Sequence, residues 1–493
     1  MASARLQPIR RILLWLTGVV ALATTSLVLA LQFWILPNIN HWRADIAASI
    51  SASSGERVTL GRIDAGWQGW HPSLRIQSLQ IADAQQHPLL YLTDIEGEMS
   101  WSTLLFGELR LARLTLSNQA FSLRRDRNGT IWLAGLALNQ PNGNHTFVQW
   151  LLHQRLIQLN HASLSWQDDQ RPAPTLFIHE VNFSLTNFER WHNFHLSATP
   201  PTLIAHPIDI QGSLTGRSPA DPASWSGKIS LRLRRADLAQ WQPWVTLPLG
   251  IRRGFGDVDA SLQFARNQII EASARGILQQ LSLQAAPDLP RLDLIDLSGG
   301  VDWKRLGSAQ SLQLDHISLR TADLVYLAPL DFYLRIAPAT AHQAPQGELR
   351  ADNADLATLN RLGHYLPLDT GQRNWLAQHA PSGWVQSLRA DWSGALPRPQ
   401  KFHLHARFRT LGIASAGGQP GVSGLSGQID GDETSGSLTL ASQQTSVDLP
   451  NILFEPHVAL DTLTGQLRWK KLSSGYQLQL SQINLANADF DGN

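Results

Sequence analysis

Apolar and polar residues alternate along most of the chain after residue 70. Two apolar residues alternate with polar ones, two residues follow as a spacer, and two more alternating apolar residues complete the pattern. It recurs at Leu74, Ile76, Leu79 and Ile81; at Leu109, Leu111, Leu114 and Leu116; at Ile157, Leu159, Leu164 and Trp166; at Leu312, Leu314, Ile317 and Leu319; and at Leu478, Leu480, Ile483 and Leu485. Alternation at period two predicts β-strands with one apolar and one polar face.

The two-residue spacer would turn the second apolar pair to the opposite face of the sheet, unless a β-bulge absorbs one residue. Bulges repeated from strand to strand predict a bent, strongly twisted sheet. We therefore expect a mainly β protein. Its elongated, mostly antiparallel sheet is curled into a groove, and a few short helices are expected at 147–156, 236–245, 355–362 and 374–380.

The N-terminal region contains an almost unbroken apolar run from Ile12 to Leu36. About 20 residues suffice to cross a bilayer as a helix, so the run predicts a transmembrane helix. A cleaved signal peptide is the alternative, because residues 21–23 form an A-x-A-like site. The apolar run continues well beyond that site, which favours an uncleaved anchor. The candidate membrane-facing residues are Ile12, Leu16, Val20, Leu27, Leu31 and Ile35.

Basic residues flank this run unequally. Arg5, Arg10 and Arg11 precede the run, whereas Arg43 is the only Lys or Arg residue shortly after it. The positive-inside rule then places the N-terminus in the cytoplasm and the body of the protein on the other side of the membrane. In a bacterium with two membranes, that side is the periplasm.

The pattern divides the chain into successive regions. We expect a cytoplasmic N-terminus at 1–11, a transmembrane helix at 12–37, a short membrane-proximal helix at 38–56, a β-groove at 57–345, a helical insertion at 346–395 and further groove strands at 396–493. The strand pattern of the last residues stops in mid-course, so we expect the sequence to be truncated and to belong to a longer protein.

Composition excludes several classes of function. The 493 residues carry a formal net charge of +1, so no basic field for nucleic acid is expected. The chain has no cysteine, which excludes disulfides, thiolate metal sites and a cysteine nucleophile.

Few residues suggest chemistry. His403 and His405 are two apart on a predicted strand and could share a metal ion, but no third ligand is near in sequence, and a polar outer face explains them equally well. The acidic turn around Asp430 and Asp432 lacks the order of a calcium loop. We therefore expect no catalytic residue, no metal and no cofactor, and we do not expect an enzyme.

Several motifs occur in a characteristic order. They are Ser54-Gly55-Glu-Arg-Val58, Ala65-Gly-Trp67-Gln-Gly-Trp70-His-Pro72-Ser-Leu74, Trp132-Leu-Ala-Gly135, Trp150-Leu-Leu-His-Gln154, Asn374-Trp-Leu-Ala-Gln-His-Ala-Pro-Ser-Gly383 and Asp391-Trp-Ser-Gly394. With the N-terminal anchor, this ordered set resembles the AsmA-like proteins of Gram-negative envelopes, and most closely their YhdP-type branch. The resemblance covers nearly the whole chain and corresponds to the N-terminal portion of a longer protein.

The resemblance implies a β-groove akin to chorein-type bridge proteins, and a part in moving phospholipid from the inner to the outer membrane in support of the permeability barrier. We accordingly expect a single-pass inner-membrane protein with its bulk in the periplasm. It would be a passive conduit that binds phospholipid and works with an outer-membrane or periplasmic partner protein. The predicted groove lining is Leu74, Ile76, Leu79, Ile81, Leu109, Leu111, Leu114, Leu116, Leu164, Trp166, Leu312, Leu314, Ile317 and Leu319.

A second hypothesis uses the same pattern. The strands could close into a dry core, and the protein would then be a structural or assembly factor of the envelope without lipid passage. Alternation alone does not separate the two hypotheses, because an open groove and a closed core both give period two.

Overall fold

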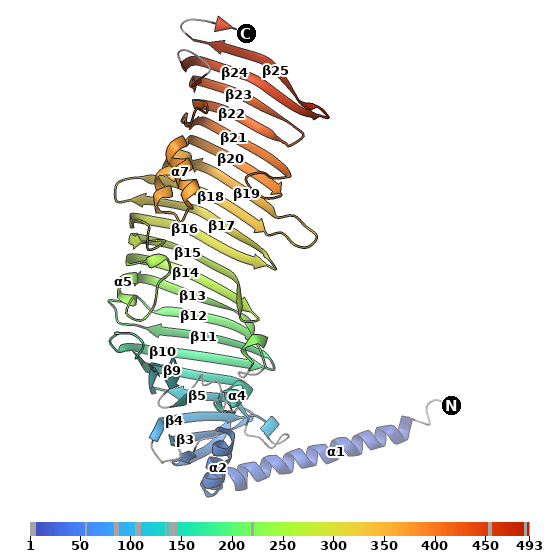
Figure 1. Cartoon of the computed structure of the whole chain (residues 1–493). Coiled ribbons are helices and arrows are strands. Elements are labelled where there is room, and N and C mark those ends of the chain that lie inside the picture. Colours follow the sequence, from blue (N-terminus) through green and yellow to red (C-terminus); the bar gives the residue numbers. More distant parts are fainter. Residues whose placement is uncertain are drawn as a thin grey trace. The chain divides into compact units, whose positions relative to one another are not determined.

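The computed structural model describes residues 6–54, 57–82, 88–103, 110–133, 136–137, 146–217, 221–451, 456–487 and 491–492 (Figure 1). The chain forms two compact units. Unit 1 comprises Met1–Pro200 and Gln211–Trp225, and unit 2 comprises Pro201–Ile210 and Ser226–Asn493.

Unit 1 begins with a continuous helical segment. It consists of α1 (Leu6–Ala30), a π-helical turn η1 (Leu31–Ile35), a 3-10 helix η2 (Leu36–Trp42) and α2 (Arg43–Ser54). Apolar side chains of α1 are exposed: Leu16 has 60% and Val20 57% of its surface free. Burial begins at Leu31, Leu36 and Ile39, where η2 contacts the first strands. The segment is long and apolar enough to cross a membrane.

The strands of unit 1 form a mostly antiparallel sheet. They are β1 (Arg57–Leu60), β2 (Ile63–Gln68), β3 (His71–Ala82), β4 (Pro88–Met99), β5 (Leu111–Ser117), β6 (Ala120–Arg125), β7 (Ile131–Leu133), β8 (Leu136–Ala137), β9 (Leu156–Asp168), β10 (Leu176–Phe188) and β11 (Trp191–Thr199), with helices α4 (Thr146–His153) and η3 (Pro222–Ser224). Strand β12 (Ile208–Thr215) is divided between the two units.

One place in unit 1 departs from the antiparallel order. Strands β5 and β6 both pair with β9 in parallel. A parallel pair needs a crossover that passes over one face of the sheet. Here the crossover runs through β7, β8 and α4, and it brings α4 onto the apolar face.

Unit 2 is an antiparallel meander in which each strand from β13 to β25 pairs with the next, as Figure 1 shows. The strands are β13 (Ser226–Asp237), β14 (Arg253–Ala265), β15 (Gln268–Leu283), β16 (Leu292–Leu306), β17 (Ala309–Thr321), β18 (Tyr326–Ala337), β19 (Gln346–Asp355), β20 (Ser382–Ser393), β21 (Lys401–Ile413), β22 (Gly421–Asp432), β23 (Ser435–Asp448), β24 (His457–Leu472), β25 (Gly475–Ala486) and β26 (Asp491–Gly492).

Short helices connect some strands of unit 2. They are α5 (Leu238–Trp241), η4 (Pro248–Gly250), α6 (Leu356–Leu362), η5 (Gly363–Tyr365) and α7 (Thr370–His379). The last three lie between β19 and β20, which still pair with each other. The range 346–395, predicted as a helical insertion, therefore contains these two strands as well as the helices. Asp355 and Asp369 cap α6 and α7, because their carboxylates accept hydrogen bonds from backbone N–H groups of the first turn.

The predicted bulges are confirmed. In β17, Leu314 and Ile317 pair with Phe332 and Leu330, which are two residues apart, so both apolar residues lie on one face. The extra residue is His316, whose φ of 49° is in the left-handed region. His161 in β9 and Gln482 in β25 occupy the same position in their patterns, with φ of 51° and 55°. The fold class is thus as expected: mainly β, open, twisted and antiparallel, with one long apolar helix.

Each unit has its own apolar core on this bulged face. In unit 1 the buried residues come from η2 and from strands β1 to β5 and β9, with Ile63 completely buried. In unit 2 they come from β13, from β15 to β18, from helices α5 and α6 and from Ala205, with Leu281 only 2% exposed. We call the face that carries these residues the apolar face of each unit.

Candidate functional site: an apolar cavity in unit 1

The apolar face of unit 1 contains a cavity of about 380 Å³. Glycine and apolar side chains alone form its lining among the described residues: Ile46, Ile50, Leu74, Ile76, Leu79, Ile81, Leu90, Leu92, Ile95, Gly97, Leu111, Leu114, Leu116, Phe121, Leu133, Trp150, Leu151, Ile157, Leu159, Phe183 and Leu185. Such a lining offers carbon contacts and suits a hydrocarbon chain.

The strand register explains how these side chains converge. On β3, Leu74, Ile76 and Leu79 pair with Gly97, Ile95 and Leu92 of β4, and all six line the cavity. In both strands the alternation of apolar and polar residues is interrupted by one extra residue, and the two interruptions lie opposite each other. In β4 the extra residue is Asp94, which has a φ of 50°. Because the bulges match, the apolar residues on either side of the spacer stay on one face.

Helix α2 covers one part of the cavity with Ile46 and Ile50, which lie one helical turn apart on the same side. The segment before and within α2 is tied to the sheet by side chains. The Asn40 amide accepts from the Ile63 N–H at 3.0 Å and donates to the Ile63 carbonyl at 2.8 Å. The Ser51 hydroxyl accepts from the Val58 N–H at 2.9 Å. Strands β1 and β2 form an edge of the sheet, and these side-chain hydrogen bonds satisfy backbone groups there that a neighbouring strand would otherwise pair with.

Helix α4 covers the cavity with Trp150 and Leu151. The last carbonyls of a helix lack partners within it, and here side chains supply them. Asn187 on β10 donates to the carbonyl oxygens of Leu151 at 3.2 Å and Gln154 at 2.7 Å. The fully buried Gln154 side chain donates to the Trp150 carbonyl and accepts from the Leu111 N–H at 2.7 Å. The helix is therefore fixed to β5 and β10 together.

His192 completes this buried polar chain. Its Nδ1 lies 2.7 Å from Asn187 Oδ1 and its Nε2 lies 3.2 Å from the Gly216 carbonyl oxygen. Asn187 Oδ1 and the Gly216 carbonyl oxygen are both acceptors, so a neutral imidazole donates to only one of them, and the shorter distance assigns the proton to Nδ1. Burial lowers the pKa of His192, and the nearby His153 lowers it further against the opposing effect of the Gly216 carbonyl.

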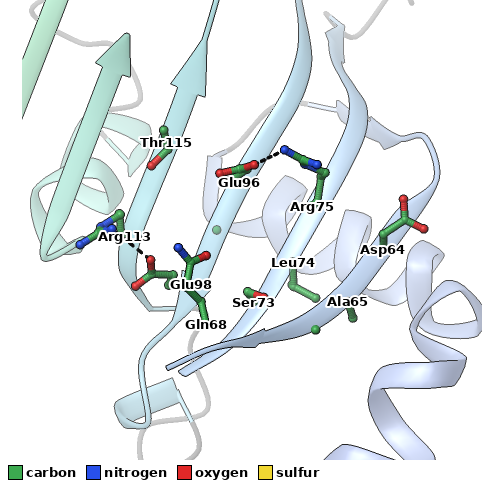
Figure 2. A pocket seen from close by; sticks show the side chains of 12 residues that line it. Asp64, Ala65, Gln68, Ser73, Leu74, Arg75, Glu96, Glu98, Arg113 and Thr115 are labelled. Atoms are coloured by element: carbon green, nitrogen blue, oxygen red, sulfur yellow. Dashed lines mark hydrogen bonds and ion pairs between the residues drawn. The ribbon is translucent and has the colours of Figure 1, made fainter. Parts of the chain in front are cut away.

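The opposite face of the same strands is charged (Figure 2). Arg75 forms ion pairs with Glu96 and, at 3.1 Å, with Asp94, and Arg113 Nη1 lies 3.3 Å from Glu98 Oε1. Arg75, Glu96, Glu98 and Arg113 line a pocket of about 320 Å³ that Thr115 also lines. Ion pairs on an exposed face contribute little stability, so this surface mainly keeps the outer side soluble.

The described residues offer little for catalysis or metal binding. No group of three or more His, Asp or Glu side chains among them is placed to hold a metal ion. His405 instead lies 2.7 Å from Asp430, and His403 lies 3.9 Å from Asp391, as separate exposed pairs.

A comparison of the sequence with protein-family models shows to which family the chain belongs. A family model described as YhdP protein matches residues 1–493. The chain belongs to the YhdP family. No curated protein and no solved structure gives a significant match. Membership of the YhdP family indicates an envelope protein of the lipid-transport type, and the apolar N-terminal helix is a candidate single membrane span.

The structure of this YhdP-family chain brings half of the predicted groove residues together. Leu74, Ile76, Leu79, Ile81, Leu111, Leu114 and Leu116 all line the cavity of unit 1. Leu164 and Trp166 lie farther along β9, opposite Ile178 and Leu176. Leu312, Leu314, Ile317 and Leu319 lie on the apolar face of unit 2, and Leu319 is part of its core. Leu109 lies outside the described residues. That any of them contacts lipid stays a prediction.

The candidate membrane residues lie in the N-terminal helical segment. Leu16, Val20 and Leu27 of α1 are exposed, Ile35 is half-buried and Leu31 is buried. Ile12 belongs to α1, and its side chain lies outside the described part.

The sequence-based lining omitted the residues that cover the cavity. Ile46 and Ile50 have helical spacing, which gives a signal for one apolar side of α2. Trp150 and Leu151 have no comparable signal, because their place over the cavity follows from the parallel pairing of β5 with β9. A period-two pattern predicts which side chains of a strand lie on its apolar face, but it does not predict which helix or loop will cover that face.

Proposed function

We propose that this protein is a membrane-anchored, passive lipid-transfer protein that shelters phospholipid acyl chains on its apolar face between the inner and the outer membrane. The observation that carries the proposal is the all-apolar cavity of unit 1, in the same unit as the candidate membrane helix. Family membership supports the same conclusion.

Physical chemistry favours a passive route. Each methylene group exposed to water costs about 0.8 kcal/mol, so an acyl chain that leaves a bilayer needs an apolar shelter, and a cavity of Leu and Ile side chains provides one at little net change in free energy. Because unit 2 carries an apolar face of its own with the same pattern, a chain could exchange one apolar environment for another. No chemical step and no cofactor are needed.

The proposed location follows from the basic residues. The arginines before the apolar run favour a cytoplasmic N-terminus, and the strands of both units would then lie in the periplasm of a Gram-negative cell. A protein at the outer membrane or in the periplasm would receive the lipid. Delivery of phospholipid would support the outer-membrane barrier.

A structural or assembly role is the second candidate. It is favoured by unit 2, where Leu238 and Leu362 from helices α5 and α6 pack with Leu281 and Leu319 of the strands. A face closed in this way would stabilise the fold without carrying lipid.

A charge placed on either face of β5 separates these functions. Leu116 lines the cavity, whereas the neighbouring Thr115 lines the charged pocket on the opposite face. We expect Leu116→Glu to abolish the extraction of fluorescent phospholipid from vesicles by the purified protein. It should also abolish complementation of the barrier defect in cells that lack the gene. Thr115→Glu should retain both activities.

The half-buried Leu116 also allows Leu116→Gln as a milder variant if the glutamate impairs folding. Full activity of a folded Leu116→Glu protein would contradict the transfer function, and a wild-type protein that extracts no phospholipid would favour the structural role.

A further inference from the structure

One edge of the sheet in unit 2 carries the same short motif twice. Strand β16 ends with Trp303-Lys304-Arg305-Leu306, and strand β24 ends with Trp469-Lys470-Lys471-Leu472. Each strand from β16 to β24 runs opposite to the one before it, so β16 and β24 run in the same direction and end at the same edge. We call this edge, which includes the β16–β17 and β24–β25 turns, the motif edge.

Lysine is confined to the motif edge. The lysines of the chain all lie among the three terminal residues of a strand at this edge: Lys228, Lys304, Lys401, Lys470 and Lys471. Lys304 pairs with Glu271 at 3.3 Å. The other four, and Arg305, form no ion pair with any side chain in the described part of the chain. The edge therefore offers cations whose charge is not neutralised by a neighbouring carboxylate.

In both motifs the apolar face ends with an indole followed by a cation. Trp303 pairs with Leu312 on the apolar face, and Arg305 follows two residues later on the same side of β16. The guanidinium carbon of Arg305 lies 5.3 Å from the centre of the Trp303 ring. In β24, Trp469 pairs with Leu478, and Lys471 follows it with the same spacing.

The leucine of each motif is exposed at the turn, with 70% of Leu306 and 47% of Leu472 accessible. A turn at the opposite edge offers a comparison. Between β17 and β18, Leu324 is 74% exposed, but the charged side chains beside it are Asp323 and Arg320, and Arg320 is paired with Asp296. An exposed leucine thus occurs at both edges, whereas at the motif edge it lies beside an unpaired cation and an indole.

This combination suits the boundary between hydrocarbon and water. Tryptophan favours that boundary, and long basic side chains place their apolar stems along hydrocarbon while the charge stays in water. Guanidinium and ammonium groups both donate hydrogen bonds to phosphate. A phospholipid whose acyl chains lie on the apolar face has to leave its phosphate in water beyond an edge of that face.

We propose that Arg305 and Lys471 each bind the phosphate of a phospholipid whose acyl chains lie on the apolar face of unit 2, beside Trp303 and Trp469. This inference rests on the proposed lipid-transfer function and adds to it the edge from which the headgroups project.

The test places a photoreactive residue at the turns of both edges. Benzoylphenylalanine replaces Leu306, Leu472 or Leu324, which are all exposed, in the full chain held in amphipol. Each protein is irradiated with radiolabelled dioleoyl phosphatidylglycerol or with dioleoylglycerol, which has the same acyl chains and no phosphate. The cation variants are Arg305→Gln and Lys471→Gln, and Arg305→Lys keeps the charge.

We expect phospholipid adducts at positions 306 and 472, and far fewer at position 324. Arg305→Gln should lower the adduct at 306 by about two- to fivefold, as the loss of one exposed ion pair predicts, and leave the adduct at 472 unchanged. Lys471→Gln should do the reverse, so each variant is the control for the other. Arg305→Lys should retain the adduct, and neither glutamine variant should change the yield with dioleoylglycerol.

Equal phospholipid adducts at 306 and 324 would overturn the inference, as would unchanged adducts in both glutamine variants or an equal loss for dioleoylglycerol. In cells, a protein adduct at 306 without lipid would also overturn it, in favour of an acidic protein partner. The same probe at Leu116 keeps the proposed function separate. A phospholipid adduct at 116 without one at 306 or 472 contradicts this inference alone, whereas no adduct at any of these positions contradicts the proposed function itself.

Discussion

The two units carry the same alternating pattern, but their apolar faces are covered differently. In unit 1 the crossover through α4 and the membrane-proximal helix α2 span the face and leave a cavity of about 380 Å³ beneath them. In unit 2 the short helices α5 and α6 contribute Leu238, Leu359 and Leu362 to one apolar cluster with strand residues such as Leu281 and Leu294. The strand pattern determines which side chains share a face. The connections between strands determine whether that face encloses a cavity or is covered by packed side chains.

The largest expected effect is a cavity made in the packed face of unit 2. Leu281→Ala removes a side chain that is only 2% exposed and should destabilise unit 2 by about 3–4 kcal/mol. Leu116→Ala in unit 1 should cost only about 1 kcal/mol, because Leu116 is half-buried and already borders a cavity. Hydrogen exchange followed by mass spectrometry reports each unit separately. Equal losses in the two units would contradict the difference in packing.

The buried polar chain that holds α4 should have the next largest effect. Asn187→Ala leaves the carbonyl groups of Leu151 and Gln154 without their side-chain donor, at a cost of about 3 kcal/mol to unit 1. Hydrogen exchange in α4 and β5 should accelerate while unit 2 stays unchanged. Asn193→Ala, an exposed asparagine on the next strand, is the control and should change stability by less than about 0.5 kcal/mol. An α4 as protected as in the wild type would show that Asn187 does not hold it.

A glycine substitution gives opposite results in the two units. A Cβ at Gly347 in unit 2 would lie 2.0 Å from the Trp392 ring, so Gly347→Ala should destabilise by about 2 kcal/mol. Gly66→Ala in unit 1 meets only Ser73 Oγ at 3.6 Å and should be neutral or stabilising by about 0.5 kcal/mol. Denaturant unfolding measures both variants. The double variant Gly347→Ala/Trp392→Leu should recover part of the loss, and no recovery would mean that the ring is not the cause.

The smallest effect concerns pH and should be confined to unit 1. Because burial lowers the pKa of His192 in the folded state, the unfolded chain binds a proton first as the pH falls below about 6.5. The stabilising contribution of the neutral imidazole is therefore fully present above that pH and decreases below it. Denaturant unfolding at pH 7.5 and 5.5 should show a smaller loss for His192→Gln than for the wild type. An identical loss would rule out His192 as the cause.

The strand pattern allowed much of the fold to be predicted. The spacer between Leu314 and Ile317 required a bulge, and His316 provides it with a left-handed backbone. The same reasoning placed Leu74, Ile76, Leu79 and Ile81 on one face, which is where the cavity lies. These are local consequences of period two and of a single extra residue per strand.

The covering of the cavity could not be predicted in the same way. The contact of Asn187 with α4 joins residues more than 30 positions apart, and it depends on the parallel pairing of β5 with β9. Asparagine on a strand usually indicates an exposed or turn position, so nothing local distinguishes Asn187 from Asn193.

The most direct measurement of the central claim is site-specific photocrosslinking in living cells. Benzoylphenylalanine is placed at Leu116, on the cavity side of β5, or at Thr115, on the charged side, and adducts are identified by mass spectrometry after irradiation. Our account predicts a phospholipid adduct at position 116 and none at position 115. The absence of lipid at position 116, or equal lipid adducts at both positions, would contradict it.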